Sequence, residues 1–210
     1  MTDNRKLRIA VGVSGGGRSL GNLLDHQASN PYEIGLVFSS SQTAGANEIA
    51  KKAKVPLLVL DFAPIHWEIT KEKLYQSLEY YGIDLVVLAG FLKLLPIDSH
   101  WENKIINIHP ALLPKYGGKG MHGHYVHEAV IKSGDIQSGA TVHFVNECYD
   151  EGSIIARATV EIESLETPES LAQKVFKAEC MLLPAVISAL SSGQLPRNTL
   201  AQLDQTGRIT

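Results

Sequence analysis

Cysteine is scarce in this chain, which has only Cys148 and Cys180 among 210 residues. Two cysteines are too few for a disulfide framework or, by themselves, for a zinc site, and we interpret both as buried thiols. Long apolar runs are missing as well: none approaches about 18 residues, so no membrane-spanning helix is predicted. The N-terminal residues lack the apolar core of a signal peptide, and we therefore expect a cytoplasmic protein without a membrane partner.

Basic residues do not outnumber acidic ones, since 19 Lys and Arg stand against 22 Asp and Glu, for a net charge of -3. Binding to a nucleic-acid backbone depends on clustered Lys and Arg, so nucleic acid is not an expected partner. A hydrophobic content of 44% is enough to fill a core. The length predicts one domain over residues 1–193 and a polar C-terminal tail over residues 194–210.

Apolar strands alternate with helical segments through the first half of the chain. Residues 84–91 form a nearly continuous apolar run, which is typical of a parallel sheet covered on both faces. The alternation predicts an α/β fold, a Rossmann-like doubly wound, mostly parallel sheet with helices on both faces. The expected strands are 7–13, 33–39, 55–60, 84–91, 105–108, 140–145 and 153–162, and the expected helices are 20–24, 46–54, 70–81, 126–133 and a long one capped by Thr167 and ended by Gly193.

A glycine loop, residues 14–19, connects the first strand to the first helix. Such a loop offers backbone N–H groups and a helix N-terminus to an anion. It is no Walker A loop, because no lysine follows Gly21, and Leu20 replaces the third glycine of the dinucleotide motif. The next strand also ends without the acid that holds an NAD ribose. We therefore favour phosphate binding over a ligand-free turn, at Gly16, Gly17, Arg18 and Ser19.

Asn107 and His109 lie two residues apart in a short apolar run that Pro110 ends. In a strand they point to the same face, at the carboxyl end where open α/β sheets bind ligands. The amide is uncharged, and the imidazole titrates near neutrality. On geometry alone, the pair is as consistent with a core Asn and His bonded to backbone as with a catalytic site.

A second group of histidines, His122, His124 and His127, lies in and just after the glycine-rich stretch 110–125, which predicts no regular element. Zinc prefers histidine ligands, but only His124 and His127 have a suitable spacing. We therefore expect a polar loop rim and no metal. A cis peptide bond is expected at Leu113–Pro114, in the same stretch.

The string Asn107-Ile-His109-Pro-Ala-Leu-Leu-Pro resembles the folate-dependent formyltransferases, and the resemblance covers most of residues 7–190. It implies transfer of a formyl group from 10-formyltetrahydrofolate, as co-substrate, to the amine of glycinamide ribonucleotide in purine synthesis. Relatives that formylate Met-tRNA share the string but carry a second domain and a different sequence after it, where this chain has Lys115-Tyr116-Gly117-Gly118.

The resemblance also implies roles for individual residues. It assigns a catalytic trio of Asn107, His109 and Asp150, although spacing alone does not join Asp150 to the other two. We expect Asn107 to donate to the oxygen that gains charge, His109 to move a proton, and Asp150 to hold the imidazole and raise its pKa. Glu179 is expected to bond the ribose. The pterin is expected to meet the backbone of Leu92, Lys93, Leu94 and Leu95, whose alternative reading is a plain strand-to-helix joint.

Two other functions remain open. The same fold and trio would suit another acceptor, such as another amino sugar, an aminated nucleotide or water. A non-catalytic module that binds folate or nucleotide is an alternative of a different class. In each case the expected partners are small molecules, and the protein is expected to be a monomer or a homodimer.

Overall fold

The computed structural model describes residues 5–193 and 201–202 of a chain that divides into two compact units, residues 1–106 and 107–210. The expected single domain over residues 1–193 stays a prediction. The expected tail over residues 194–210 lies outside the described residues, apart from Ala201–Gln202, which form the short strand β8.

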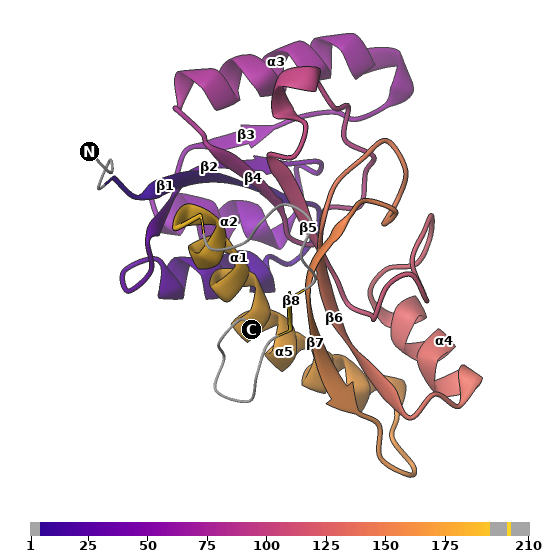
Figure 1. Cartoon of the computed structure of the whole chain (residues 1–210). Coiled ribbons are helices and arrows are strands. Elements are labelled where there is room, and N and C mark those ends of the chain that lie inside the picture. The colour runs from indigo at the N-terminus through magenta and orange to yellow at the C-terminus, as the bar shows by residue number, and fades with distance from the viewer. Residues whose placement is uncertain (1–4, 194–200, 203–210) are drawn as a thin grey trace. The chain divides into compact units, whose positions relative to one another are not determined.

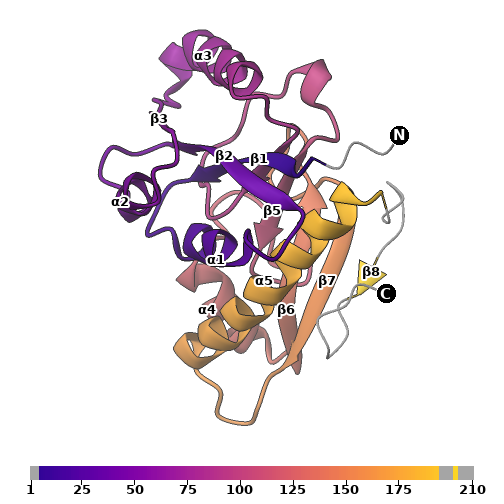
Figure 2. The ribbon, with the colours of Figure 1, turned by 90° about the vertical axis from the view of Figure 1, so that its left-hand side faces the viewer.

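The first unit alternates strand and helix, and its strands run parallel. β1 pairs with β2 on one side and β4 on the other, and β2 pairs with β3. Helices α1 and α2 lie on one face of these strands and α3 on the other (Figures 1 and 2). This arrangement confirms the doubly wound fold. The elements are β1 (Leu7–Val13), α1 (Arg18–His26), β2 (Tyr32–Ser39), α2 (Gly45–Lys52), β3 (Leu57–Val59), η1 (Pro64–His66), α3 (Trp67–Tyr80), β4 (Leu85–Leu88) and η2 (Ser99–Trp101).

The central strands of this unit are buried on both faces, as their apolar sequences predict. All four residues of β4 are buried, and a β-carbon at Gly12 of β1 would lie only 2.5 Å from the ring of Phe38. Gly90, with φ of 73°, turns the chain soon after β4. The strand therefore ends at Leu88, three residues before its expected end, and Phe91 packs edge-on against Phe38.

The second unit contains an antiparallel strand pair. The chain enters it within β5, and β6 pairs antiparallel with β7, which pairs parallel with β8. Helix α5 packs against both β6 and β7 and also contacts α4. The elements are β5 (Ile105–His109), α4 (His124–Ser133), β6 (Gln137–Phe144), β7 (Ile154–Glu161), α5 (Pro168–Ser191) and β8 (Ala201–Gln202).

Four helices begin earlier than the sequence predicts: α1 and α4 by two residues, α2 by one, at Gly45, and α3 by three, at Trp67. α1 begins at Arg18, because Gly17 adopts a left-handed conformation at the N-cap, so Arg18 and Ser19 belong to the first helical turn rather than to the loop. α4 begins at His124, inside the stretch that was expected to be irregular. Gly123 makes the sharp turn into this helix, with φ of 57° and ψ of -131°. The expected cis bond at Leu113–Pro114 is present.

The interpretation of both cysteines as buried thiols is wrong. Cys148 is exposed, because it lies in the turn between β6 and β7, and Cys180 on α5 is partly exposed. In the part of the chain that the structure describes, no helix is both long enough and apolar enough to cross a bilayer.

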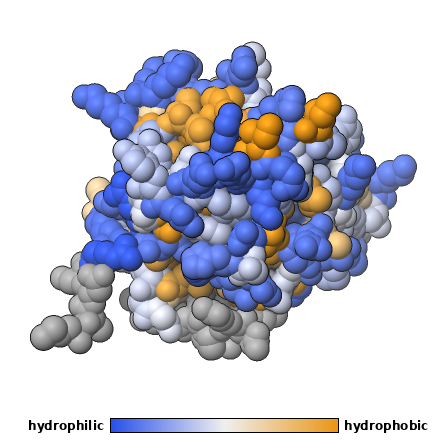
Figure 3. Space-filling model, turned by 90° about the horizontal axis from the view of Figure 1, so that it is seen from above, coloured by the Kyte–Doolittle hydropathy of each residue, from blue (hydrophilic) through white to orange (hydrophobic). Residues whose placement is uncertain are grey.

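Apolar side chains also reach the surface of the first unit. Seen from above Figure 1, where α3 lies, hydrophobic groups are surrounded by hydrophilic ones (Figure 3). Ile65 of η1 is 85% exposed and Ile69 of α3 is 55% exposed. Because hydrophobic stabilisation scales with the area removed from water, these two side chains add little to the stability of the fold.

The long helix α5 begins as its sequence predicts. The hydroxyl of Thr167 accepts from the Ser170 backbone N–H at 3.2 Å, and Ser170 Oγ accepts in return from the Thr167 N–H at 3.1 Å. Pro168 takes the first helical position, where a missing N–H costs nothing. The helix continues through Pro184 to Ser191. Beyond its end, the N–H of Gly193, which has φ of 66°, donates to the Leu190 carbonyl.

We expect Thr167→Ala to lower the free energy of unfolding by about 1 kcal/mol, because it leaves an N-terminal N–H of α5 without its acceptor. Urea denaturation followed by circular dichroism measures the loss. Thr167→Ser, which keeps the hydroxyl, is the matched control and should recover most of it. An equal loss in both variants would show that the hydroxyl does not cap the helix.

Candidate active site

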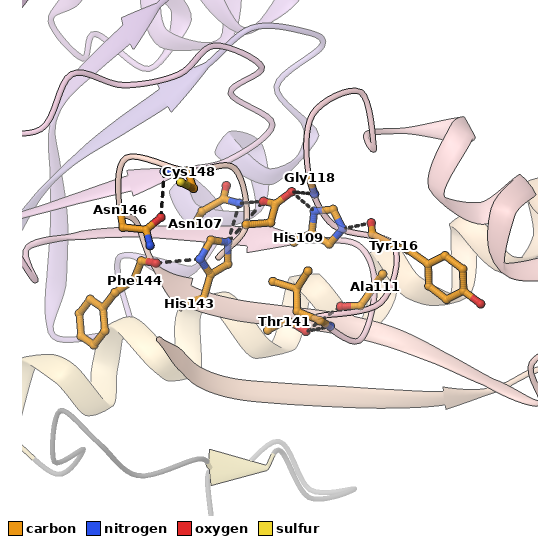
Figure 4. A network of polar contacts seen from close by, with 12 residues as sticks. Asn107, His109, Ala111, Tyr116, Gly118, Thr141, His143, Phe144, Asn146 and Cys148 are labelled. Carbon is orange, nitrogen blue, oxygen red and sulfur yellow. Dashed lines mark hydrogen bonds and ion pairs between the residues drawn. The ribbon is translucent and has the colours of Figure 1, made fainter. Parts of the chain in front are cut away.

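The structure brings Asn107, His109 and Asp150 together within the second unit. Asn107 and His109 are labelled in Figure 4. Asn107 and His109 project from β5, and Asp150 comes from the turn between β6 and β7. Asn107 Nδ2 lies 3.3 Å from Asp150 Oδ1, and His109 Nδ1 lies 3.5 Å from Asp150 Oδ2. The period of two along β5 thus places both residues against one carboxylate, while their chemical roles stay predictions.

A fourth member of this group, His143 on β6, was missed by the sequence reasoning. Its Nε2 lies 3.0 Å from Asn107 Nδ2 and 3.5 Å from Asp150 Oδ1, and its side chain is 2% exposed. A signal was present, because Thr141 and His143 are polar residues at alternate positions of a buried strand. His143 contacts Asn107 and Asp150, and Thr141 bonds the loop that follows β5.

The hydrogen bonds fix the orientation of the Asn107 amide. His143 Nδ1 lies 2.8 Å from the Phe144 carbonyl, which can only accept, so Nδ1 carries a hydrogen. In the neutral ring Nε2 is then an acceptor for Asn107 Nδ2, whose second hydrogen points to Asp150. Both amide hydrogens are used within the site, which leaves Asn107 Oδ1 as an acceptor. Donation to a substrate oxygen therefore requires one of these two bonds to be exchanged.

His109 is held from both sides of its ring. Nε2 lies 2.7 Å from the Tyr116 carbonyl, so it donates there. Nδ1 faces Asp150, and an ionised carboxylate offers only lone pairs, so contact with it favours a hydrogen on Nδ1 as well. The geometry therefore suits an imidazolium. At 3.5 Å the Nδ1 contact is long, which leaves this hydrogen available to an incoming atom.

Burial acts against that charge. It is the largest effect on His109 and lowers its pKa, while Asp150 and the Tyr116 carbonyl raise the pKa and His143 lowers it further. The net pKa lies below the ordinary value, so Asp150 acts in the expected direction but does not outweigh burial. A buried base of lowered pKa beside a carboxylate is typical of groups that exchange protons near neutral pH.

Asp150 is kept ionised by its neighbours. Burial, the largest effect, favours the neutral acid, but contact with His143, the charge on His109 and the Gly118 N–H together lower the pKa of Asp150. The Gly118 N–H donates to Oδ2 at 2.9 Å. Asp150 has φ of 59°, and two residues later a β-carbon at Gly152 would lie 1.7 Å from the Phe144 carbonyl oxygen. The turn that carries the acid is thus closely packed.

The loop from Ala111 to Gly118 is fastened to the neighbouring strands. Thr141 Oγ1 donates to the Ala111 carbonyl at 2.6 Å and accepts from the Leu113 N–H at 3.1 Å. Arg157 of β7 donates to the Leu113 carbonyl. These bonds hold the loop whose Tyr116 carbonyl and Gly118 N–H contact His109 and Asp150.

The expected phosphate loop lies in the first unit. Gly17 has φ of 80°, and a β-carbon there would lie 2.7 Å from Ala46 of α2, whereas Gly15 and Gly16 have open space around them. Arg18 is exposed in the first turn of α1. The first N–H groups of a helix have no intrahelical acceptors, so this turn is suited to bind an anion.

The segment expected to hold the pterin lies in the same unit and is bonded to this loop. Ser14 Oγ accepts from the Leu92 N–H at 2.9 Å and lies 2.6 Å from Ser40 Oγ. The Leu92 N–H is therefore already bonded. Lys93 is exposed and Leu95 is buried. The segment lies between β4 and η2, a short 3-10 helix, so both pterin binding and a strand-to-helix joint stay predictions. The segment, residues 92–95 (Leu92, Lys93, Leu94 and Leu95), is irregular.

The remaining predicted residues lie elsewhere in the second unit. Glu179 is half-buried on α5. His124 at the start of α4 pairs with Glu128 at 2.9 Å. Within residues 5–193 and 201–202, no three His, Cys, Asp or Glu side chains are grouped so that they could hold a metal ion.

Chemically, the site combines a buried base, a carboxylate that is 11% exposed and a partly exposed amide. It offers one hydrogen on His109 Nδ1 that can be given up and one acceptor on Asn107. Such a set can carry a proton between two nitrogen atoms and stabilise an oxygen that gains negative charge.

Several known proteins are similar to this chain. The family model described as Formyl transferase matches residues 7–187. A phosphoribosylglycinamide formyltransferase of Arabidopsis thaliana is 38% identical over 192 residues, and a trifunctional purine biosynthetic protein of Drosophila melanogaster is 35% identical over 202 residues. The crystal structure of a phosphoribosylglycinamide formyltransferase from Anaplasma phagocytophilum matches with a TM-score of 0.81 at 30% identity.

The coverage of these matches differs. The alignments cover 89% of this chain for the Arabidopsis protein and 92% for the Drosophila protein, but only 66% and 14% of those relatives. The structural match covers 98% of this chain and 94% of the Anaplasma chain. Since the family model spans most of the chain, this chain belongs to the formyl transferase family.

Proposed function

We propose that this protein is a phosphoribosylglycinamide formyltransferase that formylates the amine of glycinamide ribonucleotide with 10-formyltetrahydrofolate. The observation that carries the proposal is the buried contact of His109 with Asp150 beside the amide of Asn107. The names of the relatives support the choice of acceptor.

In this reaction one carbon–nitrogen bond forms to the acceptor amine, one breaks to the donor nitrogen, and one proton moves between these nitrogens. The co-substrate supplies an electrophilic formyl carbon. Asp150 balances the positive ring of His109 before the transfer, and His109 gives its Nδ1 hydrogen to the formyl oxygen or the leaving nitrogen. The ring is then neutral, and it takes up the proton that the attacking amine gives up, which restores its positive charge. Asn107 Oδ1 accepts a hydrogen bond from the attacking amine. One Nδ2–H leaves its partner within the site and donates to the formyl oxygen.

The first unit supplies backbone groups in this proposal. The phosphate of the acceptor binds at Gly16, Gly17 and the first turn of α1, where Arg18 adds a guanidinium and Ser19 a hydroxyl. Glu179 of the second unit bonds the ribose. The pterin binds the backbone of residues 92–95 through groups other than the Leu92 N–H, which Ser14 already takes.

His109→Ala should reduce turnover by roughly 10² to 10⁴-fold, because the proton carrier is lost. Asp150→Asn, which tolerates the left-handed backbone, should lower the pKa of His109 and reduce turnover more than binding. Tetrahydrofolate production from 10-formyltetrahydrofolate, with and without glycinamide ribonucleotide, measures both. Turnover that needs no ribonucleotide would instead indicate water as acceptor, and near-normal turnover in His109→Ala would refute the catalytic assignment.

Substitutions in the glycine loop separate phosphate binding from folding. Gly16→Val should weaken ribonucleotide binding with an unchanged melting temperature, because its side chain enters open space where the anion is proposed to bind. Gly17→Ala should lower the melting temperature, since its β-carbon would press on α2. Calorimetric titration with each substrate is the measurement. Weakened folate binding with normal ribonucleotide binding in Gly16→Val would assign the loop to the other substrate.

No metal takes part in the proposed reaction. Chelator should leave activity unchanged, and elemental analysis should find less than one metal ion per chain. Stoichiometric zinc that is lost together with activity would contradict this. The absence of nucleic-acid and membrane partners, a monomeric or homodimeric state and a cytoplasmic location also stay predictions, and the Arabidopsis relative is described as chloroplastic.

A further inference from the structure

Four polar side chains outside the trio hold the loop whose backbone contacts His109 and Asp150. We call these residues, Lys115, Tyr116, Ser133 and Asp135, the clamp. The phenol of Tyr116 donates to Asp135 Oδ2 at 2.8 Å and lies 2.6 Å from Ser133 Oγ. Lys115 Nζ lies 3.1 and 3.0 Å from the two oxygens of Asp135. The clamp therefore ties the loop to the C-terminal end of α4.

The clamp holds a backbone that few side chains adopt. Tyr116 has φ of 58°, in the left-handed region that disfavours residues other than glycine, asparagine and aspartate. In this conformation its carbonyl accepts from His109 Nε2 at 2.7 Å. Two residues later the Gly118 N–H donates to Asp150 Oδ2 at 2.9 Å. Both ends of the acid–base contact thus depend on backbone groups of one three-residue segment.

The two backbone groups act in the same direction. A carbonyl facing Nε2 stabilises a hydrogen on that nitrogen and so the positive ring, whereas an N–H facing Oδ2 stabilises the negative carboxylate. Neither Tyr116 nor Asp135 needs to touch a substrate to have this effect. Two hydrogen bonds connect Asp135 to the imidazole through Tyr116. The phenol of Tyr116 donates to Asp135, and the carbonyl of Tyr116 accepts from His109 Nε2.

We propose that the clamp is a positioning device that holds the Tyr116 carbonyl against His109 Nε2 and so favours the protonated imidazole, with Asp135 and the Tyr116 phenol as its positioning residues. The inference deepens the proposed function and rests on His109 as the proton carrier. The carbonyl of Tyr116 stays on Nε2 only while the ring of Tyr116 is anchored. When the anchor is lost, the carbonyl withdraws and burial favours the neutral imidazole.

The other groups that face His109 are accounted for. Asp150, from the turn between β6 and β7, raises its pKa, and His143, from β6, lowers it. From the loop after β5, only the Tyr116 carbonyl acts on the ring. Changes in the clamp do not touch His143, so a shift in the titration of His109 reports the two backbone groups of this segment, the Tyr116 carbonyl on Nε2 and the Gly118 N–H on Asp150.

The test compares Asp135→Asn and Tyr116→Phe with the wild-type full-length chain. NMR of the imidazole nitrogens, with signals assigned by their loss in His109→Gln, should show a lower pKa for His109 in both variants, by about half a unit or more. The alkaline limb of kcat/KM should move to lower pH by the same amount, with kcat affected more than KM. The double variant should show little shift beyond that of Tyr116→Phe, because both changes act on the hydrogen bond between the phenol and residue 135: Tyr116→Phe removes its donor, and Asp135→Asn replaces its charged acceptor by a neutral one.

Glu161→Gln is the matched control, since it also removes a surface acid, one that accepts from Gln137 Nε2 at 2.7 Å without contacting the clamp. It should leave the titration unchanged. Lower melting temperatures with an unchanged His109 pKa in Tyr116→Phe would overturn the proposal and leave the clamp a merely structural role. If Asp135→Asn fails to fold, Tyr116→Phe and Lys115→Met decide the outcome. Wild-type protein without formyl transfer would instead contradict the proposed function, and the NMR titration would still test the clamp.

Discussion

A carboxylate that is almost entirely removed from water needs donors on several sides, and Asp150 is the group on which the polar site of the second unit depends. β5 supplies Asn107 and His109, and the loop between β5 and α4 supplies the Gly118 N–H, while His143 of β6 orients the Asn107 amide. Since each donor is itself oriented by another bond, the members of the site act as a unit. Their individual contributions are therefore not expected to add.

The two compact units offer different chemistry to a ligand. Around the glycine loop of the first unit, the available groups belong to the backbone and to the start of a helix, which tolerate changes of side chain. In the second unit the candidate catalytic groups are side chains, which backbone groups orient. Replacing one of these side chains would remove the proposed proton carrier or its counter-charge.

The parts that could be predicted from the sequence are those with a local signal. The period of two brings Asn107 and His109 to one face, and the Thr167-Pro168 pair marks the start of α5. Asp150 lies 43 residues from Asn107, and only the family resemblance joined them. The Tyr116 carbonyl could not be foreseen, because a left-handed backbone at a tyrosine leaves no mark in composition or spacing.

The crowding at Gly152 has a consequence for attempts to redesign this protein. Any side chain at this position would collide with the backbone of Phe144, so a randomised library should return glycine alone there. The length and shape of the neighbouring turn are then not adjustable by selection. Gly15 and Gly16, which have open space around them, are positions where sequence diversity can be introduced without unfolding the chain. Changes of substrate preference are therefore best sought in the first unit.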